Sequence, residues 1–128
     1  MDADSDPDMD TEFCEVVITA DDPRWLAGFT RTLVEERLAA CGHLVAPIRS
    51  IYRWDGAVHD ETEARVALHT RRALVDVIVA RTNQEHGYEV PCVIALPLTG
   101  GNPAYLAWLA AETATSSAGP DDAPRSPA

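Results

Sequence analysis

The sequence predicts an α+β fold of the ferredoxin-like type: a split β-α-β repeat (βαββαβ) with a long central β-hairpin and an added C-terminal helix. Three observations lead to this prediction. Extended and helical patterns alternate in the order strand, helix, two strands, helix, strand, helix. The two middle strands are joined by Asp55-Gly56, a strong signal for a tight hairpin turn. The 128 residues are enough for one domain with a single core.

The first strand and the first helix follow from local patterns. Residues 13–19 are apolar and rich in β-branched side chains, which is typical of a short buried strand. Asp22 and Pro23 then supply the N-cap and the first residue of a helix that reaches about Ala40. We expect Gly42 to end this helix.

Residues 43–54 and 57–70 form the two arms of the predicted hairpin, and each arm is about twice as long as a usual strand. Pro47 cannot donate a hydrogen bond to a neighbouring strand, so we expect a bulge or a break there. A two-residue loop at Asp55-Gly56 places four cross-strand pairs on one face: Trp54 with Ala57, Tyr52 with His59, Ser50 with Glu61, and Ile48 with Glu63.

Both faces of this hairpin carry apolar side chains. Aromatic residues share the first face with carboxylates. The opposite face holds Arg53, Ile51, Val58, Ala64, Val66 and Leu68. The core of one subunit cannot cover both faces of so long a ribbon, so the sequence predicts an oligomer.

The C-terminal half continues the alternation. Residues 71–85 have apolar side chains at helical spacing, and residues 90–96 read as a buried strand that Pro91 must begin or flank. Asn102 and Pro103 then supply the N-cap and the first residue of the last helix.

The formal net charge of −11 is concentrated in the tails. Residues 1–12 carry six acidic and no basic side chains, and residues 113–128 are rich in Ser, Gly, Pro and Ala; we expect both to be disordered around a domain at 13–112. An acidic chain gains nothing from counterion release, so no nucleic-acid partner is expected. No secretory signal and no apolar run of about 18–20 residues is seen, which predicts no membrane partner and a cytoplasmic location with reduced cysteines.

Four motifs carry a family resemblance. They are Glu-Glu-Arg-Leu-Ala-Ala-Cys at 35–41, Ser-Ile-Tyr-Arg-Trp-Asp-Gly at 50–56, Tyr-Glu-Val-Pro at 88–91 and Gly-Asn-Pro-Ala-Tyr-Leu-Ala-Trp-Leu at 101–109. In order and spacing they resemble the CutA divalent-cation tolerance family, over about residues 16–109. The resemblance implies a homotrimer of ferredoxin-like subunits, related in shape to the PII signalling proteins, whose hairpins interlock. The resemblance does not imply an enzyme, and the sequence shows no catalytic motif that would.

The same resemblance implies a role in tolerance of divalent metal ions such as copper. Copper-binding relatives use a cysteine near the end of the first strand and a histidine pair before the Tyr-x-x-Pro motif, and here those positions hold Ile18 and Glu85-His86. Glu85 and His86 alone would make a weak Cu(II) or Zn(II) site. The alternative is that this pair is a solvated helix end.

A second metal candidate comes from spacing alone. Cys41 and His43 are two residues apart, so on a strand their side chains point to the same side. Cys41 is alternatively a small core residue, because free cysteine is among the most buried residue types. Cys14 and Cys92 fall in predicted strands and are interpreted as small core residues.

The residues expected at the trimer interface or in an inter-subunit cleft are Ile51, Tyr52, Trp54, Glu61, Glu63, His69, Tyr88 and Trp108. His69 stands where the family usually has lysine, so an anion contact there would need a protonated histidine. Alternatively, His69 is a polar residue on the wetter face of the ribbon.

Two functions remain open at this point. The first is a homotrimeric protein associated with divalent metal tolerance, with weak binding of Cu(II) or Zn(II). The alternative is a PII-like sensor or scaffold that binds a small ligand or protein partner at inter-subunit clefts, with no metal and no catalysis. Acid–base catalysis by Glu61 and Glu63 with His59 and Tyr52 is less favoured, because carboxylates at this strand spacing more often balance nearby arginines.

Overall fold

The computed structural model describes residues 12–115, so both expected disordered tails lie outside the described residues, except for their innermost positions. The elements are β1 (Phe13–Ala20), α2 (Pro23–Glu35), β2 (Cys41–Trp54), β3 (Ala57–Arg71), the 3-10 turn η1 (Arg72–Leu74), α3 (Val75–Glu85), β4 (Val93–Pro97) and α4 (Pro103–Glu112). The strands form one antiparallel sheet in the order β2-β3-β1-β4. This is the ferredoxin-like arrangement, and the predicted fold class is confirmed.

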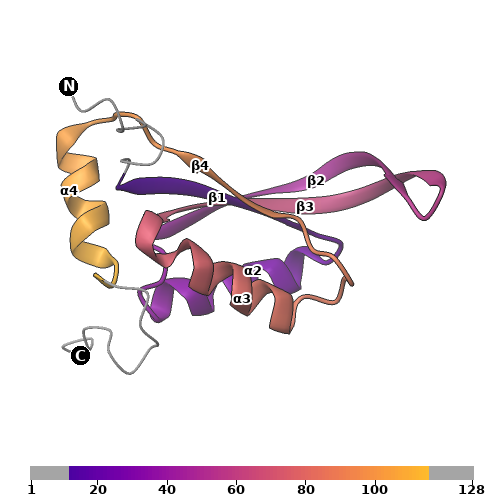
Figure 1. Cartoon of the computed structure of the whole chain (residues 1–128), viewed down its shortest axis with the longest axis horizontal. Coiled ribbons are helices and arrows are strands. Elements are labelled where there is room, and N and C mark those ends of the chain that lie inside the picture. The colour runs from indigo at the N-terminus through magenta and orange to yellow at the C-terminus, as the bar shows by residue number, and fades with distance from the viewer. Residues whose placement is uncertain (1–11, 116–128) are drawn as a thin grey trace, which may run out of the picture.

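The core lies between the sheet and the two helices α2 and α3, which cover the same face of the sheet (Figure 1). Its fully buried side chains come from β1, α2, β3, η1 and α3: Val16, Ile18, Leu26, Leu33, Val66, Leu68, Leu74 and Ile78. Helix α4 stands at one end of the sheet, apart from this helical layer (Figure 1). We call the sheet face away from α2 and α3 the open face.

Helix α2 ends earlier than predicted. Its start is as expected, because the Asp22 side chain accepts a hydrogen bond from the Arg24 backbone N–H at 2.9 Å and proline follows the cap. The helix ends at Glu35, however, and Arg37 turns the chain with φ of +62°. Gly42 does not end the helix, since it lies within β2.

Gly42 is required by close packing. A Cβ atom there would lie 2.5 Å from Thr30 Cγ2 and 3.0 Å from Leu68 Cδ2, below the usual contact limit. The glycine therefore lets β2 approach the core side of the sheet closely.

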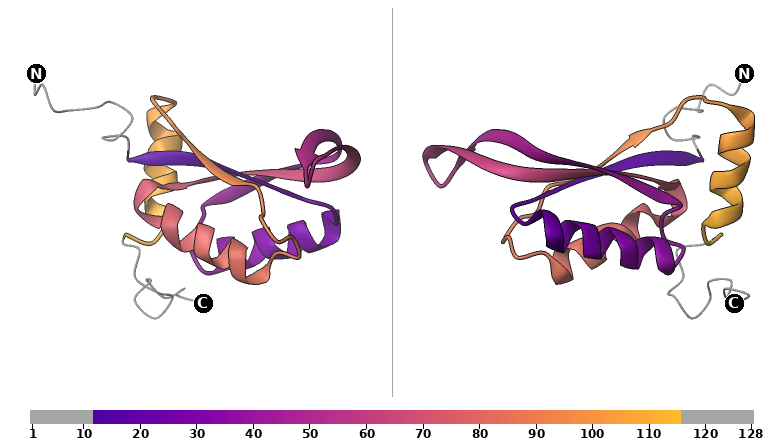
Figure 2. Two further views of the ribbon diagram at one scale, coloured as in Figure 1. Left: turned by 45° about the vertical axis from the view of Figure 1, so that its right-hand side comes forward. Right: turned by 180° about the vertical axis from the view of Figure 1, so that it is seen from behind.

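The hairpin has the predicted register. All four expected pairs are present, and the loop residues Asp55 and Gly56 have φ of +52° and +78°. The expected irregularity is also present, because the ladder shifts register between Val45 and Ile48, around Pro47. Beyond the helices, β2 and β3 continue as a free two-stranded ribbon (Figures 1 and 2).

The distal ribbon exposes apolar side chains on both faces. Ile51 and Val58 are each 63% exposed on one face, and Trp54 is 45% exposed on the other. Exposed apolar groups on two sides of a thin ribbon are what the sequence predicted.

The C-terminal half differs from prediction in two boundaries. The helix predicted over 71–85 is divided into η1 and α3, and β4 begins at Val93 rather than at position 90. Cys92 therefore precedes the strand and is exposed, which corrects its expected place in a buried strand. Helix α4 begins as predicted, with Asn102 Oδ1 accepting from the Ala104 N–H at 3.0 Å. No helix among the described residues is long and apolar enough to cross a membrane.

Candidate metal centre

Three side chains with metal-binding atoms gather on the open face of the sheet. Cys41 is paired with His69 across β2 and β3, and His43 lies two residues further along β2. Because Leu68 points into the core, its neighbour His69 points to the open face. The ligand atoms of Cys41, His43 and His69 all lie within 4.8 Å of one another, and the two imidazole centroids are 5.4 Å apart.

The Tyr105 hydroxyl from α4 reaches into this cluster. Its oxygen lies 2.6 Å from His69 Nδ1 and 3.2 Å from Cys41 Sγ. Burial, followed by the interaction with Cys41 and the charge of Glu15, raises the pKa of Tyr105 to about 12. The phenol therefore keeps its proton at neutral pH and can act as a donor.

Glu15 of β1 holds the other side of the His69 ring. Its Oε2 lies 2.9 Å from His69 Nε2, and both side chains are at least partly covered. The consistent hydrogen assignment has Nε2–H donating to Glu15, the Tyr105 hydroxyl donating to Nδ1, and the Cys41 thiol donating to the Tyr105 oxygen.

One sulfur and two imidazoles suit a first-row transition metal ion. Zn(II) takes thiolate and imidazole ligands in tetrahedral sites, and imidazole also suits Cu(II). Three protein ligands leave one coordination position for water or another group. The hydrogen bond from His69 to a carboxylate is the usual outer partner of a metal-bound histidine.

The structure does not make a ligand pair of Glu85 and His86. His86 Nε2 lies 2.8 Å from the Thr19 carbonyl oxygen, and its Nδ1 accepts from the Tyr88 N–H at 3.0 Å. Both ring nitrogens are thus occupied. Glu85 instead binds Arg81 at 2.7 Å. The solvated-end alternative is also wrong for His86, which is only 8% exposed and meets the Trp25 ring edge-on at 5.0 Å.

Near the root of the ribbon, Glu63 is buried, at 6% exposure, and accepts a hydrogen bond from the Tyr88 hydroxyl at 2.6 Å. Burial and this bond raise the pKa of Tyr88. His59 stacks on Tyr52 at 5.3 Å, with its Nε2 3.2 Å from the Trp54 carbonyl oxygen.

The acid–base arrangement considered for catalysis is not formed. Glu61 is exposed, and among the described residues neither Glu61 nor Glu63 is hydrogen-bonded to His59. The Glu63–Tyr88 contact at the ribbon root and the Tyr52–His59 stack nearer the turn are therefore separate features of the described residues, with no hydrogen bond between His59 and either carboxylate.

Comparison with known proteins gives the family. The family model described as "CutA1 divalent ion tolerance protein" matches residues 14–112 of the chain. This chain belongs to the CutA1 family. The divalent-cation tolerance protein CutA of Thermus thermophilus is 38% identical over 98 residues, covering 77% of this chain and 95% of the relative. The chloroplastic protein CutA of Arabidopsis thaliana is 44% identical over 78 residues, covering 61% of this chain and 43% of the relative.

Solved CutA1 structures have the same fold. CutA1 from Oryza sativa superposes with a TM-score of 0.79 at 33% identity, covering 87% of this chain and all of that one. The Thermus thermophilus protein gives a TM-score of 0.76 at 37% identity, over 79% of this chain and 98% of that one. The chain spans about half the length of the plant and animal CutA relatives that it matches.

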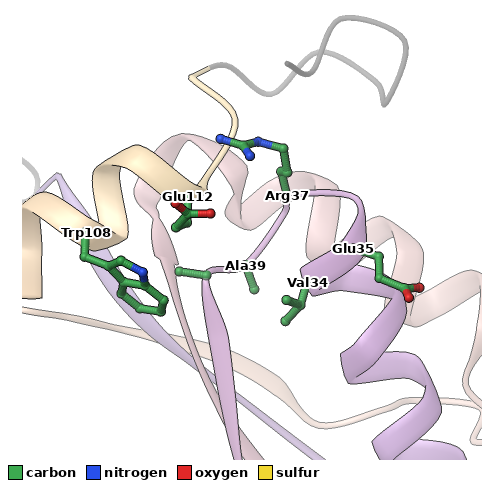
Figure 3. A pocket seen from close by; sticks show the side chains of 7 residues that line it. Val34, Glu35, Arg37, Ala39, Trp108 and Glu112 are labelled. Atoms are coloured by element: carbon green, nitrogen blue, oxygen red, sulfur yellow. The ribbon is translucent and has the colours of Figure 1, made fainter. Parts of the chain in front are cut away.

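A hollow in this CutA1 subunit lies between the end of α2 and α4 (Figure 3). It is lined by Val34, Glu35, Arg37, Ala39, Ala40, Trp108 and Glu112. Arg37 donates to the Ala111 carbonyl oxygen at 2.7 Å, so this arginine ties the two elements together. Trp108, an expected cleft residue, lies beside Tyr105 with ring centroids 5.5 Å apart.

Sequence reasoning found two members of the cluster and missed three. The two-residue spacing gave Cys41 and His43, whereas His69 was placed in a cleft without a link to them. Glu15 and Tyr105 had no assigned role. The signal that could have found Glu15 and His69 is register, because His69 faces Cys41 on one side and Glu15 on the other.

Proposed function

We propose that this CutA1 family member is a homotrimeric divalent-cation tolerance protein that binds a Zn(II) or Cu(II) ion at Cys41, His43 and His69. The observation that carries the proposal is the approach of the three ligand atoms to within 4.8 Å of one another on one face of the sheet. The relatives are named for tolerance of divalent cations, which fits a protein that meets such ions.

The ligand set supports a transition metal over Mg²⁺ or Ca²⁺. Those hard cations prefer oxygen ligands, whereas this cluster offers a sulfur and two nitrogens. His43 is exposed, so an ion can reach the cluster from solvent in the isolated subunit. Cys41 is half-buried rather than fully buried, which favours a ligand role over that of a core residue.

The trimer is supported by the ribbon. Its exposed Ile51, Val58 and Trp54 side chains have no cover within the described part of the chain. Burial of such groups against neighbouring subunits is favourable by about 25 cal/mol for each Å² of apolar surface.

The metal proposal is tested by calorimetric titration of the full chain with Zn(II), and by absorption spectroscopy with Co(II) as a stand-in. We expect one ion per chain and a thiolate-to-cobalt charge-transfer band. His43→Ala should weaken binding by at least about tenfold, because a ligand is lost. His59→Ala, a histidine outside the cluster, is the matched control and should bind like wild type.

Equal binding by His43→Ala and wild type would place the ion elsewhere and contradict this site. His86→Ala separates the two candidates that the sequence raised. We expect it to keep the ion, because both nitrogens of His86 are engaged by the backbone.

A second candidate function is the PII-like sensor, and the buried Glu63–Tyr88 contact favours it. Glu63 is only 6% exposed, and burying a carboxylate is costly unless hydrogen bonds or opposite charges compensate; in a trimer, a neighbouring subunit's ribbon would enclose it further. The test is the melting temperature of the full chain with a panel of small metabolites in the presence of a chelator. A shift that Glu63→Gln abolishes would support a ligand site there, and no shift from any compound would count against it.

A further inference from the structure

We infer that Tyr105 is a gate for the metal site: its hydroxyl occupies the position between Cys41 and His69 that the ion must take, and Glu15 holds His69 so that Nδ1 is the ligand atom. This rests on the proposed metal function and adds how the site is controlled. Five residues from β1, β2, β3 and α4 then act together.

Glu15 decides which nitrogen of His69 faces the ion. Its carboxylate lies 2.9 Å from Nε2, so that nitrogen carries the hydrogen and donates it. The lone pair on Nδ1 then points toward the side on which Tyr105 and Cys41 lie. A carboxylate that orients a histidine in this way is the common outer support of a metal ligand. Glu15 is therefore a positioning residue.

Tyr105 competes for the same space. A Zn(II) ion bound to a histidine nitrogen lies about 2.0–2.1 Å from it, and about 2.3 Å from a cysteine sulfur. The Tyr105 oxygen already lies 2.6 Å from Nδ1 and 3.2 Å from Sγ. An ion on the Nδ1 lone pair would collide with this oxygen, so the hydroxyl must leave before the ion can bind both ligands.

The place of Tyr105 in α4 allows this movement. Tyr105 lies in the first turn of the helix, whereas the far end is anchored by Arg71 to the Ala110 carbonyl oxygen at 2.8 Å and by Arg37 to that of Ala111. The anchored end can stay in place while the first turn or the Tyr105 side chain moves. Metal binding is thereby coupled to the position of α4 and of the neighbouring Trp108.

The experiment measures Zn(II) affinity of full-length wild type, Tyr105→Phe and Glu15→Gln. Tyr105→Phe should bind Zn(II) about fivefold to tenfold more tightly. In wild type the ion must first break the hydrogen bonds of the Tyr105 hydroxyl with His69 and Cys41, and the variant lacks them. Glu15→Gln should weaken binding by about tenfold. Its melting temperature without metal should stay near that of wild type. Tyr52→Phe is the matched control and should leave the affinity unchanged, because that hydroxyl lies on the ribbon.

The outcomes separate the gate from the metal function. Equal or weaker binding by Tyr105→Phe, with wild type binding normally, would overturn the gate and leave metal binding intact. If Tyr105→Phe binds more weakly and the tyrosine contribution to the Cu(II) spectrum is lost, Tyr105 is a ligand of the ion and the gate is overturned. Binding by Tyr105→Phe in the absence of wild-type binding would support the gate strongly. Failure of every variant to bind would overturn both.

Discussion

Gly42 shows how a single missing side chain sets the path of β2 past the core. A Cβ atom at this position would meet Thr30, Leu68 and Val66 at 2.5, 3.0 and 3.1 Å. Two of these neighbours are β-branched, so their side chains cannot easily turn away. We expect Gly42→Ala to destabilise the subunit by about 1–3 kcal/mol, as measured by urea unfolding.

Gly28 supplies the control for Gly42, because a Cβ atom there has nothing within 4 Å. It lies inside α2, where alanine is favoured over glycine by about 1 kcal/mol. Gly28→Ala should therefore leave stability unchanged or raise it. A Gly42→Ala protein as stable as wild type would contradict the packing described here.

The three tyrosines give a second prediction at the residue scale. The pKa values of Tyr52, Tyr88 and Tyr105 are all raised, in each case first by burial, and that of Tyr105 reaches about 12. An ultraviolet titration of the phenols should therefore show less ionisation at pH 10 than three free tyrosines would, since a free tyrosine is half ionised there.

The sign of the effect on stability follows from these shifts. The unfolded chain loses its phenolic protons at about pH 10, earlier than the folded chain does. The stability that these protonated phenols give the folded chain is fully present below pH 10. It is lost as the pH rises from there through the pKa values of the tyrosines in the folded chain. The urea midpoint should fall across that window, and Tyr88→Phe should reduce the fall. A midpoint that does not change between pH 9 and 12 would contradict the prediction.

At the scale of elements, the sequence predicted what local chemistry determines. Asp55-Gly56 fixed the register of the ribbon, and Asp22 and Asn102 marked the starts of two helices correctly. The end of α2 was not predictable, because Arg37 adopts a positive φ that its residue type does not favour. The strand β4 starts later than predicted because Pro91 has no backbone N–H to donate to a neighbouring strand.

In the candidate site, too, some residues could be predicted from the sequence and others could not. The pairing of Cys41 with His43 follows from the two-residue period of a strand, so it was available from the sequence. The addition of His69 and Glu15 depends on how three strands align, and that of Tyr105 on where α4 docks. The Asp55-Gly56 turn sets the β2–β3 alignment only up to the register shift between Val45 and Ile48, and tertiary packing decides the pairing of β1 with β3 and the position of α4.

The docking of α4 gives a prediction at this scale. Arg71 donates to the Ala110 carbonyl oxygen and, at 3.1 Å, to Thr113 Oγ1, and it also pairs with Glu12 at 2.6 Å. The bond to Ala110 satisfies a carbonyl group in the last turn of the helix, where carbonyl groups lack partners within the helix. We expect Arg71→Leu to speed amide hydrogen exchange across α4 without changing that of α2.

Arg31 is the matched control for Arg71. Its pair with Glu35 lies on the surface of α2, with both side chains more than half exposed. Such pairs contribute little, so Arg31→Leu should leave exchange in α4 unchanged. Equal protection of α4 in wild type and Arg71→Leu would show that the arginine does not hold the helix.

At the scale of the whole molecule, the ribbon is the feature that a single subunit does not explain. It extends beyond the helical layer with apolar groups on both faces, whereas the rest of the sheet buries one face (Figure 2). The proposed trimer accounts for it, because neighbouring subunits can cover both faces at once. We expect light scattering to give three times the 13.9 kDa chain mass at micromolar concentration.

Ile51→Glu tests the role of the ribbon in that assembly. Ile51 is 63% exposed, so the change costs the folded subunit little, but in a trimer it would bury a charge. We expect a smaller species with an unchanged far-ultraviolet circular dichroism spectrum. Ala80→Glu adds the same charge to an exposed position on α3 and should keep the wild-type mass. A monomeric wild type would mean that the ribbon is exposed for another reason, and the sensor alternative would lose its inter-subunit cleft as well. An Ile51→Glu protein of wild-type mass would mean that this position of the ribbon is not buried in the assembly.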